Sequence, residues 1–201
     1  DPDDVETMVE EVVGALGGVD VLVNNAATKT DDLEAFFASP EDYDLETWRE
    51  VMSVNLDGVF LVARSVARRM RTQGRGGSIV QTASIYGIRA PDPRIYEGSR
   101  YLDTEISTPA VYSASKSGVV GLTRHLAAQW APDGIRVNAL TPGGCESGQN
   151  DEFRRRYARR VPMDRMAQPD EMVGAVIYLA SDASSYVTGH NLVVDGGLSA
   201  W

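Results

Sequence analysis

Hydrophobic positions along the chain follow two alternating spacings. Residues 4–16 carry apolar side chains at helical spacing, and residues 19–23 form a short apolar run typical of a buried strand. Strands separated by helices need crossover connections, so the pattern predicts one α/β domain over 1–201 with a doubly wound parallel sheet covered on both faces. The further elements that it predicts are helices over 46–71, 110–130 and about 169–179, and strands over 78–82, 135–140 and 191–194.

One segment, 88–110, interrupts this alternation. It holds three prolines, three arginines and two tyrosines without a clear period. A loop of this length inside a compact domain is usually functional or disordered. Two interpretations stay open: a lid that covers a substrate, and a plain surface insertion.

Charge and composition exclude several classes of function. The formal net charge of -10 argues against nucleic acid and anionic membranes as main partners. The single cysteine, Cys145, allows no internal disulfide and suits a cytoplasmic location. No apolar stretch reaches the roughly 18 residues of a membrane span. The two histidines, His125 and His190, have no acidic or cysteine cluster beside them, so we expect no metal site.

Tyr112 and Lys116 carry the most informative chemistry of the sequence. They are four residues apart on the predicted helix 110–130, which places both side chains on one face. A compact ammonium attracts a phenolate by about 4 kcal/mol at 4 Å and an intermediate dielectric. We therefore expect Lys116 to lower the pKa of Tyr112 toward neutral pH, which would make the phenol a usable acid or base. The alternative is an exposed pair at the start of a helix.

Four further motifs give this pair a context, in a fixed order along the chain. Together with Tyr112 and Lys116 they resemble the short-chain dehydrogenase/reductase family over nearly the whole chain. The resemblance implies a Rossmann-like fold, NAD or NADP as the cofactor, and oxidoreduction between an alcohol and a carbonyl. The motifs are Asn24-Asn25-Ala26-Ala27, Asn55 within Ser53-Val54-Asn55-Leu56, Ser84 after the strand 78–82, and Thr141-Pro142-Gly143-Gly144.

The resemblance implies a role for each of four catalytic residues. Tyr112 would be the general acid/base, and Lys116 would depress its pKa and hold the nicotinamide ribose. Ser84 would bind the substrate oxygen through its hydroxyl. Asn55 would hold a water that passes protons to the lysine, although a buried asparagine that bonds to the backbone would satisfy the same position.

Two loops would hold the dinucleotide by the same resemblance. The first follows the strand 19–23, where the family usually has glycine and this chain has Ala27, a change that costs little if its φ is negative. The second follows the strand 135–140 and would grip the nicotinamide amide. With Tyr112 and Lys116, the expected cofactor-binding residues are Asn25, Ala26, Ala27, Pro142, Gly143, Gly144, Cys145 and Ser147.

The glycine-rich turn that opens the family's fold has no counterpart in the sequence. By resemblance, Asp1 falls after the family's third strand, so we expect an N-terminally truncated domain that retains about four strands, with 19–23 as an exposed edge. A mass near 21.8 kDa would rule out a longer chain. If the molecule starts at Asp1, we expect weak dinucleotide affinity.

The substrate side is expected in the segment 88–110 and just before it. The run from Ser84 to Gly98 resembles family members linked to bacterial surface-sugar and flagellin glycan pathways. The resemblance points to a sugar or sugar-phosphate alcohol, with polyol, gluconate-type and 3-oxoacyl substrates left open. Arginines would clamp an anion and tyrosines would stack on a sugar. The expected substrate residues are Tyr86, Arg94, Tyr96 and Arg100.

Two other functional classes stay open. A catalytically inactive scaffold on the same fold would explain the missing phosphate-binding turn. An oligomerisation module would use the small residues Ser113, Ser117 and Gly121 on one face of the helix 110–130. In the resembling family this helix and the helix 46–71 build a tetramer interface, so we expect a homo-oligomer, either a tetramer or a dimer.

Overall fold

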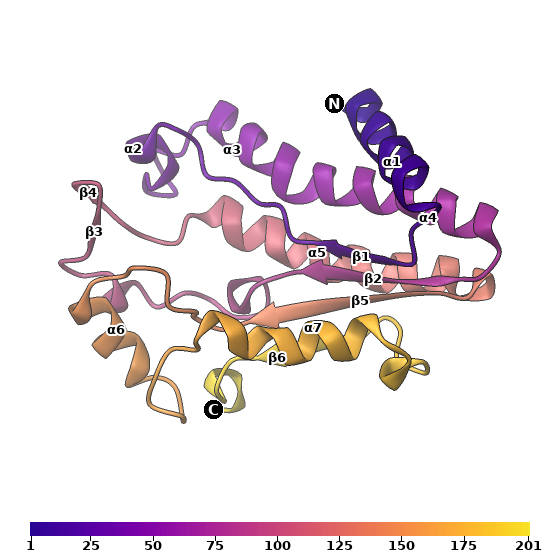
Figure 1. Cartoon of the computed structure of the whole chain (residues 1–201). Coiled ribbons are helices and arrows are strands. Elements are labelled where there is room, and N and C mark those ends of the chain that lie inside the picture. Colours follow the sequence, from indigo (N-terminus) through magenta and orange to yellow (C-terminus); the bar gives the residue numbers. More distant parts are fainter.

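A four-stranded parallel sheet forms the centre of the molecule, which is described over all residues 1–201 by a computed structural model. The strand order is β1-β2-β5-β6, and every neighbouring pair runs parallel (Figure 1). The predicted fold class, an α/β parallel sheet of four strands, is therefore confirmed. The strands are β1 (Val21–Asn24), β2 (Gly77–Thr82), β5 (Ile135–Pro142) and β6 (Asn191–Val194).

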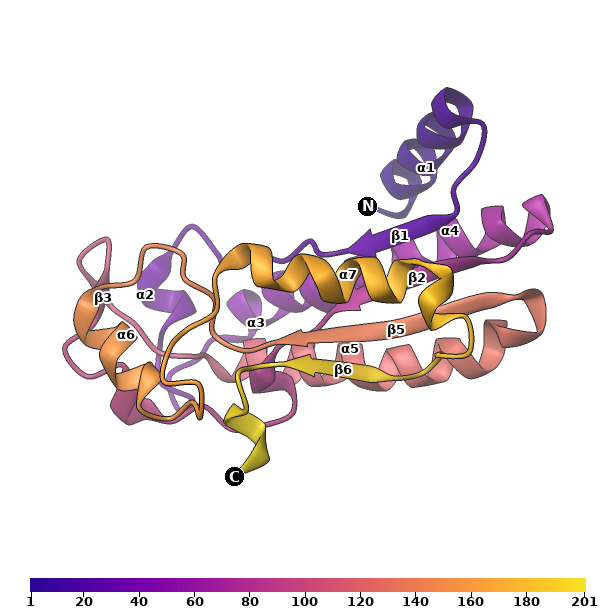
Figure 2. The ribbon, with the colours of Figure 1, turned by 60° about the horizontal axis from the view of Figure 1, so that its bottom comes forward.

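Helices cover both faces of this sheet. Helices α4 and α5 lie against one face, and α7 crosses the other (Figure 2). Helix α5 matches its predicted range, whereas α2, α6 and the small hairpin β3–β4 were not expected. The helices are α1 (Pro2–Leu16), α2 (Leu33–Phe36), α3 (Leu45–Met52), α4 (Val59–Gln73), α5 (Ala110–Trp130), α6 (Asp151–Ala158) and α7 (Val173–Ala180). No helix combines the length and the apolar character needed to cross a lipid bilayer.

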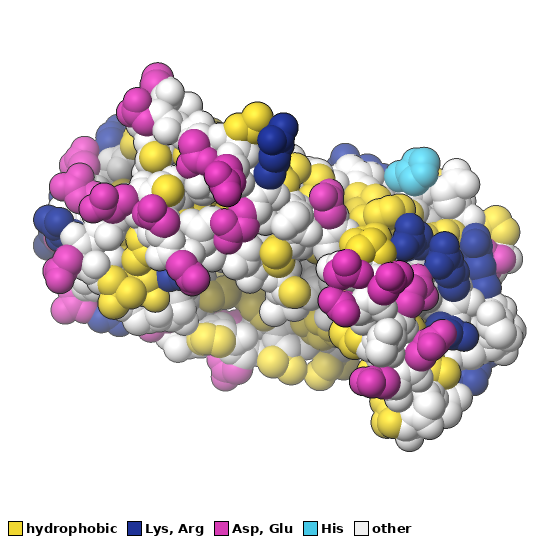
Figure 3. All heavy atoms as spheres, turned by 90° about the horizontal axis from the view of Figure 1, so that it is seen from above, with side chains coloured by type: hydrophobic (Ala, Val, Ile, Leu, Met, Phe, Trp, Pro, Cys, Tyr) yellow, Lys and Arg dark blue, Asp and Glu magenta, His cyan; other side chains and the backbone are white.

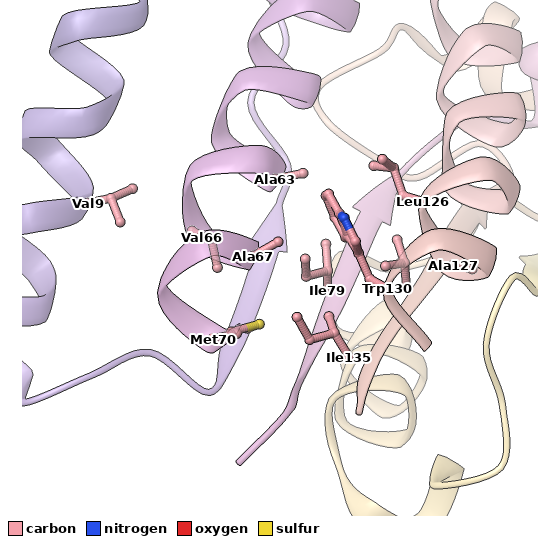
Figure 4. Packing of buried hydrophobic residues seen from close by; sticks show 11 residues of the cluster. Val9, Ala63, Val66, Ala67, Met70, Ile79, Leu126, Ala127, Trp130 and Ile135 are labelled. Carbon is pink, nitrogen blue, oxygen red and sulfur yellow. The ribbon is translucent and has the colours of Figure 1, made fainter. Parts of the chain in front are cut away.

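The core follows from the alternation of side chains along β2. Ile79 points toward α4 and α5, and its neighbour Val80 points toward α7; both are fully buried. Figure 4 shows the ring of Trp130 of α5 beside Ile79 of the sheet and directed toward Ala63 of α4. A strand that is apolar on both faces is typical of a parallel sheet with helices on each side.

The helix predicted over 46–71 is not one regular α-helix. A π-helical turn, Ser53–Gly58, joins α3 to α4 and contains Asn55, which is fully buried. Such turns are rare and are often found at functional sites, because the extra residue changes the direction of nearby side chains. Hydrophobic spacing alone does not reveal a single inserted residue, which is why the interruption was missed.

Helix α1 packs on the rest of the molecule through Val9, which is 3% exposed in the main hydrophobic cluster, and two exposed ion pairs flank this contact. Glu6 pairs with Arg68 and Glu10 with Arg69 of α4, at 2.9 and 2.7 Å. The acidic side chains of α1 adjoin the basic ones of α4 at the right of Figure 3. Beside α1, the outer edge of β1 is unpaired, and Val21 and Val23 are 42% and 44% exposed.

The segment 88–110 is ordered and is held against α6. It contains a 3₁₀ turn, Pro93–Ile95, and the hairpin formed by β3 (Arg100–Tyr101) and β4 (Thr104–Glu105). Asp92 pairs with Arg160 at 2.6 Å, and Glu97 pairs with Arg156 of α6 at 3.1 Å. Because these partners lie about 60 residues apart in the sequence, no local pattern in 88–110 predicts its conformation.

Gln73 offers a test of how the end of α4 fixes the start of β1. Its side chain accepts a hydrogen bond from the Val19 backbone N–H at 2.7 Å and donates one to the Val19 carbonyl at 2.8 Å. We expect Gln73→Leu to lower the free energy of unfolding by about 1–3 kcal/mol, because both backbone groups lose their partner. Urea unfolding followed by circular dichroism measures this as a lower midpoint with an unchanged slope. The exposed Thr72→Ala is the control, and an equal loss there would contradict the explanation.

Candidate active site

A pocket of about 430 Å³ opens at the carboxyl end of the sheet, within the range of about 300–1,000 Å³ that is usual for small-molecule sites. Its walls come from eight separate stretches of the chain. Aromatic and hydroxyl side chains predominate. The lining consists of Ala27, Thr28, Lys29, Phe36, Phe37, Ser84, Ile85, Tyr86, Tyr96, Ser107, Thr108, Pro109, Tyr112, Gly143, Gly144, Cys145, Gln149, Phe153, Tyr157 and Met166.

Ser84 and Tyr112 reach this pocket from two neighbouring elements. Ser84 follows β2 and caps the turn Ile85–Gly87, where its hydroxyl accepts a hydrogen bond from the Tyr86 backbone N–H at 3.3 Å. Tyr112 lies in the first turn of α5. Gly87 lets the turn pack directly on α5, since a Cβ there would lie 2.7 Å from the Lys116 carbonyl oxygen. The hydroxyl of Ser117 reinforces the contact by donating to the Gly87 carbonyl at 2.7 Å.

Lys116 lies behind Tyr112 and is only 3% exposed. Its ammonium donates to the Thr82 carbonyl at 2.9 Å and is 5.9 Å from the centroid of the Tyr112 ring. No carboxylate pairs with it, and burial lowers the pKa of Lys116 from 10.5 to about 8. The predicted pair is therefore not an exposed one on the helix surface.

The pKa of Tyr112 differs from the sequence-based prediction. We expected Lys116 to lower it, but burial raises the pKa of Tyr112 above its usual value of 10.0. A hydrogen bond with Ser84 acts in the opposite direction and is the smaller effect. The physical reason is that the same packing that brings the two groups together removes water from both, and loss of hydration disfavours the charged form of each.

Asn55 supports the loop that follows β1. Its side-chain oxygen accepts a hydrogen bond from the Thr28 backbone N–H at 2.8 Å, and its amide nitrogen is 3.5 Å from the Thr28 carbonyl. The bond to backbone, which was the simpler of the two interpretations of this residue, is present. The π-helical turn directs Asn55 to this position, and Thr28 lines the pocket.

Both loops that are expected to hold a dinucleotide reach the pocket, but only some of their predicted residues line it. Ala27, Gly143, Gly144 and Cys145 line it. Ala27 is not among the residues with positive φ, so alanine is accommodated there without strain. Outside the lining are Asn25 and Ala26, which are exposed, Pro142, which ends β5, and Ser147, which is also exposed.

Gln149 was not predicted and lines the pocket near the position expected for Ser147. Its amide donates to the Cys145 carbonyl at 3.1 Å and accepts from the Ser147 backbone N–H at 2.7 Å. The loop is further held by Tyr157, whose hydroxyl accepts from the Gly144 N–H at 2.6 Å. These contacts fix the backbone of the loop, and its sequence alone does not indicate them.

The buried ammonium of Lys116 fits the nicotinamide cofactor. Lysine has three donors, and only the Thr82 carbonyl accepts from this one. Two N–H groups therefore stay available for hydroxyl acceptors such as those of a ribose. The exposed loop at Asn25 and Ala26 lies beyond the carboxyl end of β1, the side of an α/β sheet where dinucleotides bind.

Only two of the four predicted substrate residues reach the pocket. Tyr86 and Tyr96 line it and are joined hydroxyl to hydroxyl at 3.3 Å, and Tyr96 is 2.5 Å from the Thr108 hydroxyl. Arg94 is instead 80% exposed and pairs with Asp92, and Arg100 donates to the Asp103 carbonyl. Both arginines are engaged by acceptors two or three residues away, so the insertion does not direct them inward.

Several pocket residues lie outside every motif of the sequence. Phe36 ends α2 and Phe37 follows it, and Phe153 and Tyr157 come from α6. The spacing of Phe153 and Tyr157, four residues apart between charged residues, was a usable signal for a short amphipathic helix. Phe36 and Phe37 belong to a single helical turn, which is too short to show a period.

Comparisons with known proteins identify the family. The family model described as enoyl-(acyl carrier protein) reductase matches residues 1–199. The 2-dehydro-3-deoxy-D-gluconate 5-dehydrogenase of Escherichia coli is 33% identical over 97% of this chain and 71% of its own length. The L-rhamnose 1-dehydrogenase (NAD(P)(+)) of Azotobacter vinelandii is 35% identical over 98% of this chain and 72% of its own.

A solved structure gives the same result. The gluconate 5-dehydrogenase of Burkholderia cenocepacia, in complex with NADP and tartrate, superimposes with a TM-score of 0.85 at 34% identity, covering 100% of this chain and 72% of that one. These similarities define the chain as an oxidoreductase of a class that uses NAD or NADP. Within that class it belongs to the short-chain dehydrogenase/reductase family.

The low pKa of Lys116 predicts an unusual dependence of stability on pH. Between about 8 and 10.5 the unfolded chain binds a proton at this residue that the folded chain does not, so stability rises with pH across this window. At about 1.4 kcal/mol per pKa unit, we expect the wild type to gain up to about 3 kcal/mol relative to Lys116→Met. Urea unfolding of both proteins at pH 7, 8, 9 and 10 without dinucleotide measures the difference. A constant difference would contradict the burial of a charge at this position.

Proposed function

We propose that the chain interconverts a secondary alcohol and a carbonyl on a polyhydroxylated, sugar-like substrate, with NAD or NADP as the hydride partner and Tyr112 as general acid/base. The observation that carries this proposal is the meeting of the Ser84 hydroxyl and the Tyr112 phenol in one pocket, with the Lys116 ammonium buried behind them. Tyr112 and Lys116 share helix α5, and Ser84 comes from the turn after β2, 28 residues before Tyr112 in the sequence.

Each side chain then has a task set by its position. Ser84 donates a hydrogen bond to the substrate oxygen and holds it beside the phenol. Tyr112 gives its proton to that oxygen during reduction and receives it during oxidation. Lys116, with two spare donors, holds the ribose and favours the phenolate once the cofactor covers the site. Bound nicotinamide supplies or accepts the hydride at carbon.

The raised pKa of Tyr112 suits one direction of this reaction. A phenol that keeps its proton at neutral pH is ready to donate it to a carbonyl oxygen as that oxygen gains charge. Asn55 contributes by positioning Thr28 on the pocket wall. We also propose that Asn55 holds a water molecule that relays protons toward Lys116.

The lining of the pocket supports a polyhydroxylated substrate. Aromatic rings stack on the apolar faces of sugars, and the linked hydroxyls of Tyr86, Tyr96 and Thr108 offer both donors and acceptors. The names of the relatives, which refer to gluconates and rhamnose, agree with this choice. We propose further that the segment 88–110, which supplies Tyr96 and Thr108, acts as the lid over this substrate.

Replacement of the proposed acid/base is the direct test. Tyr112→Phe removes one hydroxyl, and we expect kcat/KM to fall by about 10²–10⁴-fold in both directions, because the proton has no other carrier. Nicotinamide absorbance with a panel of sugar acids, polyols and their keto forms measures it. Tyr178→Phe, which alters an exposed tyrosine of α7 outside the pocket, should keep full activity. Full activity in Tyr112→Phe would reject the assignment, and no activity in the wild type would favour an inactive scaffold.

We also propose a homo-oligomer, as the resemblance implies, in a cytoplasmic setting, which the single cysteine suits. The outer surface of α4 and of the turn before it exposes Phe60 and Val54, at 38% and 36%. A Cβ at Gly121 of α5 would meet no other atom within 4 Å, so a partner helix could approach there closely. Size-exclusion chromatography with light scattering at micromolar concentration should give the mass of a dimer or tetramer, and a monomer would reject this part.

A further inference from the structure

The charge of the pocket is opposite to that of the molecule. The chain carries a formal net charge of -10, and acidic side chains gather at the upper left of Figure 3. The pocket lining contains no aspartate or glutamate and one cationic side chain, Lys29. A single positive charge at the wall of a pocket without acidic side chains suits a ligand that is negatively charged at one end.

Lys29 is held in place on both sides of its backbone. Thr28 is bound by the buried Asn55 at 2.8 Å, and the buried Thr30 donates its hydroxyl hydrogen bond to the Asp32 carbonyl at 2.9 Å. The residue between them therefore has little freedom to leave the pocket wall. Lys29 is exposed and lines the pocket, so it belongs to the mouth, whereas Tyr112 is half-buried.

The insertion positions the ammonium itself. The Nζ atom of Lys29 lies 3.7 Å from the centroid of the Tyr101 ring in the hairpin β3–β4, a cation–π contact. No carboxylate pairs with Lys29, although the chain has 29 acidic residues. An aromatic ring orients a cation without neutralising it, so the charge stays available to a ligand.

We propose that Lys29, oriented by Tyr101, binds the carboxylate of a polyhydroxy acid whose alcohol or carbonyl carbon lies at Ser84 and Tyr112. This specificity rests on the proposed function and adds the substrate class to it. A carboxylate carries one negative charge, which one ammonium matches. A phosphate monoester carries about 1.5–2 charges at pH 7 and usually collects an arginine fork, and no arginine lines this pocket.

The strength of the contact follows from its exposure. A charge pair at the mouth of a pocket is partly hydrated and screened by salt, so it adds specificity more than affinity. We expect a preference of about fivefold for an acid over the matching neutral polyol, expressed in KM and weakened by added salt. The reaction itself takes place at Ser84 and Tyr112, so we expect this contact to leave kcat unaffected.

D-Gluconate and D-glucitol test the proposal, because they share a carbon skeleton and differ by a carboxylate in place of a hydroxymethyl group. We expect Lys29→Met to remove the preference for gluconate through a higher KM for gluconate alone, with kcat nearly unchanged. Lys29→Arg should keep the preference. Arg124→Met removes one positive charge from an exposed residue of α5 outside the pocket, and it should leave both substrates unaffected.

Two variants of Tyr101 separate orientation from charge. Tyr101→Phe keeps the aromatic face and should keep the preference, whereas Tyr101→Leu should reduce it about twofold because the ammonium loses its orientation. D-Glucitol 6-phosphate is the phosphate probe. The proposal is overturned in favour of a phosphate if the wild type has a lower KM for this compound than for gluconate and if that KM rises in Lys29→Met.

The outcomes distinguish this inference from the proposed function. One outcome is that the wild type turns over both substrates while Lys29→Met changes the two KM values equally or not at all. That result overturns the role of Lys29 and leaves the enzymatic proposal standing. If the wild type turns over neither substrate, saturation-transfer NMR decides. Gluconate binding that is lost in Lys29→Met then supports the carboxylate site, and absent or Lys29-independent binding rejects it.

Discussion

The close packing of the turn Ile85–Gly87 on helix α5 is the constraint on which the site depends. Gly87 lies so near the backbone of α5 that no other residue fits without moving the turn. This contact brings the strand end that carries Ser84 against the helix turn that carries Tyr112. It also encloses Lys116, whose one protein acceptor is the carbonyl of Thr82 at the end of the same strand. Hydroxyl, phenol and ammonium are therefore positioned together by one packing contact.

Loss of hydration, and not attraction between charges, governs the protonation of this group in the folded chain. Burial lowers the pKa of Lys116 and raises that of Tyr112, so each group favours its neutral form. A ligand that brings acceptors to the ammonium would therefore have a large effect on both, because Lys116 has donors without partners. Catalytic sites often combine buried titratable groups with unused hydrogen-bonding capacity in this way.

The remainder of the pocket is built by segments that are not part of the sheet. The insertion 88–110 contributes Tyr96 and Thr108, and it is held to α6 by one ion pair and by the packing of Tyr96 on Phe153 at 5.4 Å between ring centroids. Its hairpin also supplies the ring that orients Lys29. The turn after β2 and helix α5 therefore fix the reacting groups, whereas the insertion and α6 shape the space that a substrate enters.

The alternation of hydrophobic spacing determined the α/β class, the four strands and the range of α5, because periodicity is a local property of the chain. The spacing of Tyr112 and Lys116 likewise placed them on one helix face. Only the tertiary structure decided the π-helical turn at Asn55, the outward positions of Arg94 and Arg100, the role of Gln149, and the direction of the Tyr112 pKa. Each of these depends on burial, hydrogen bonds or ion pairs that the folded backbone sets, and hydrophobic spacing does not encode them.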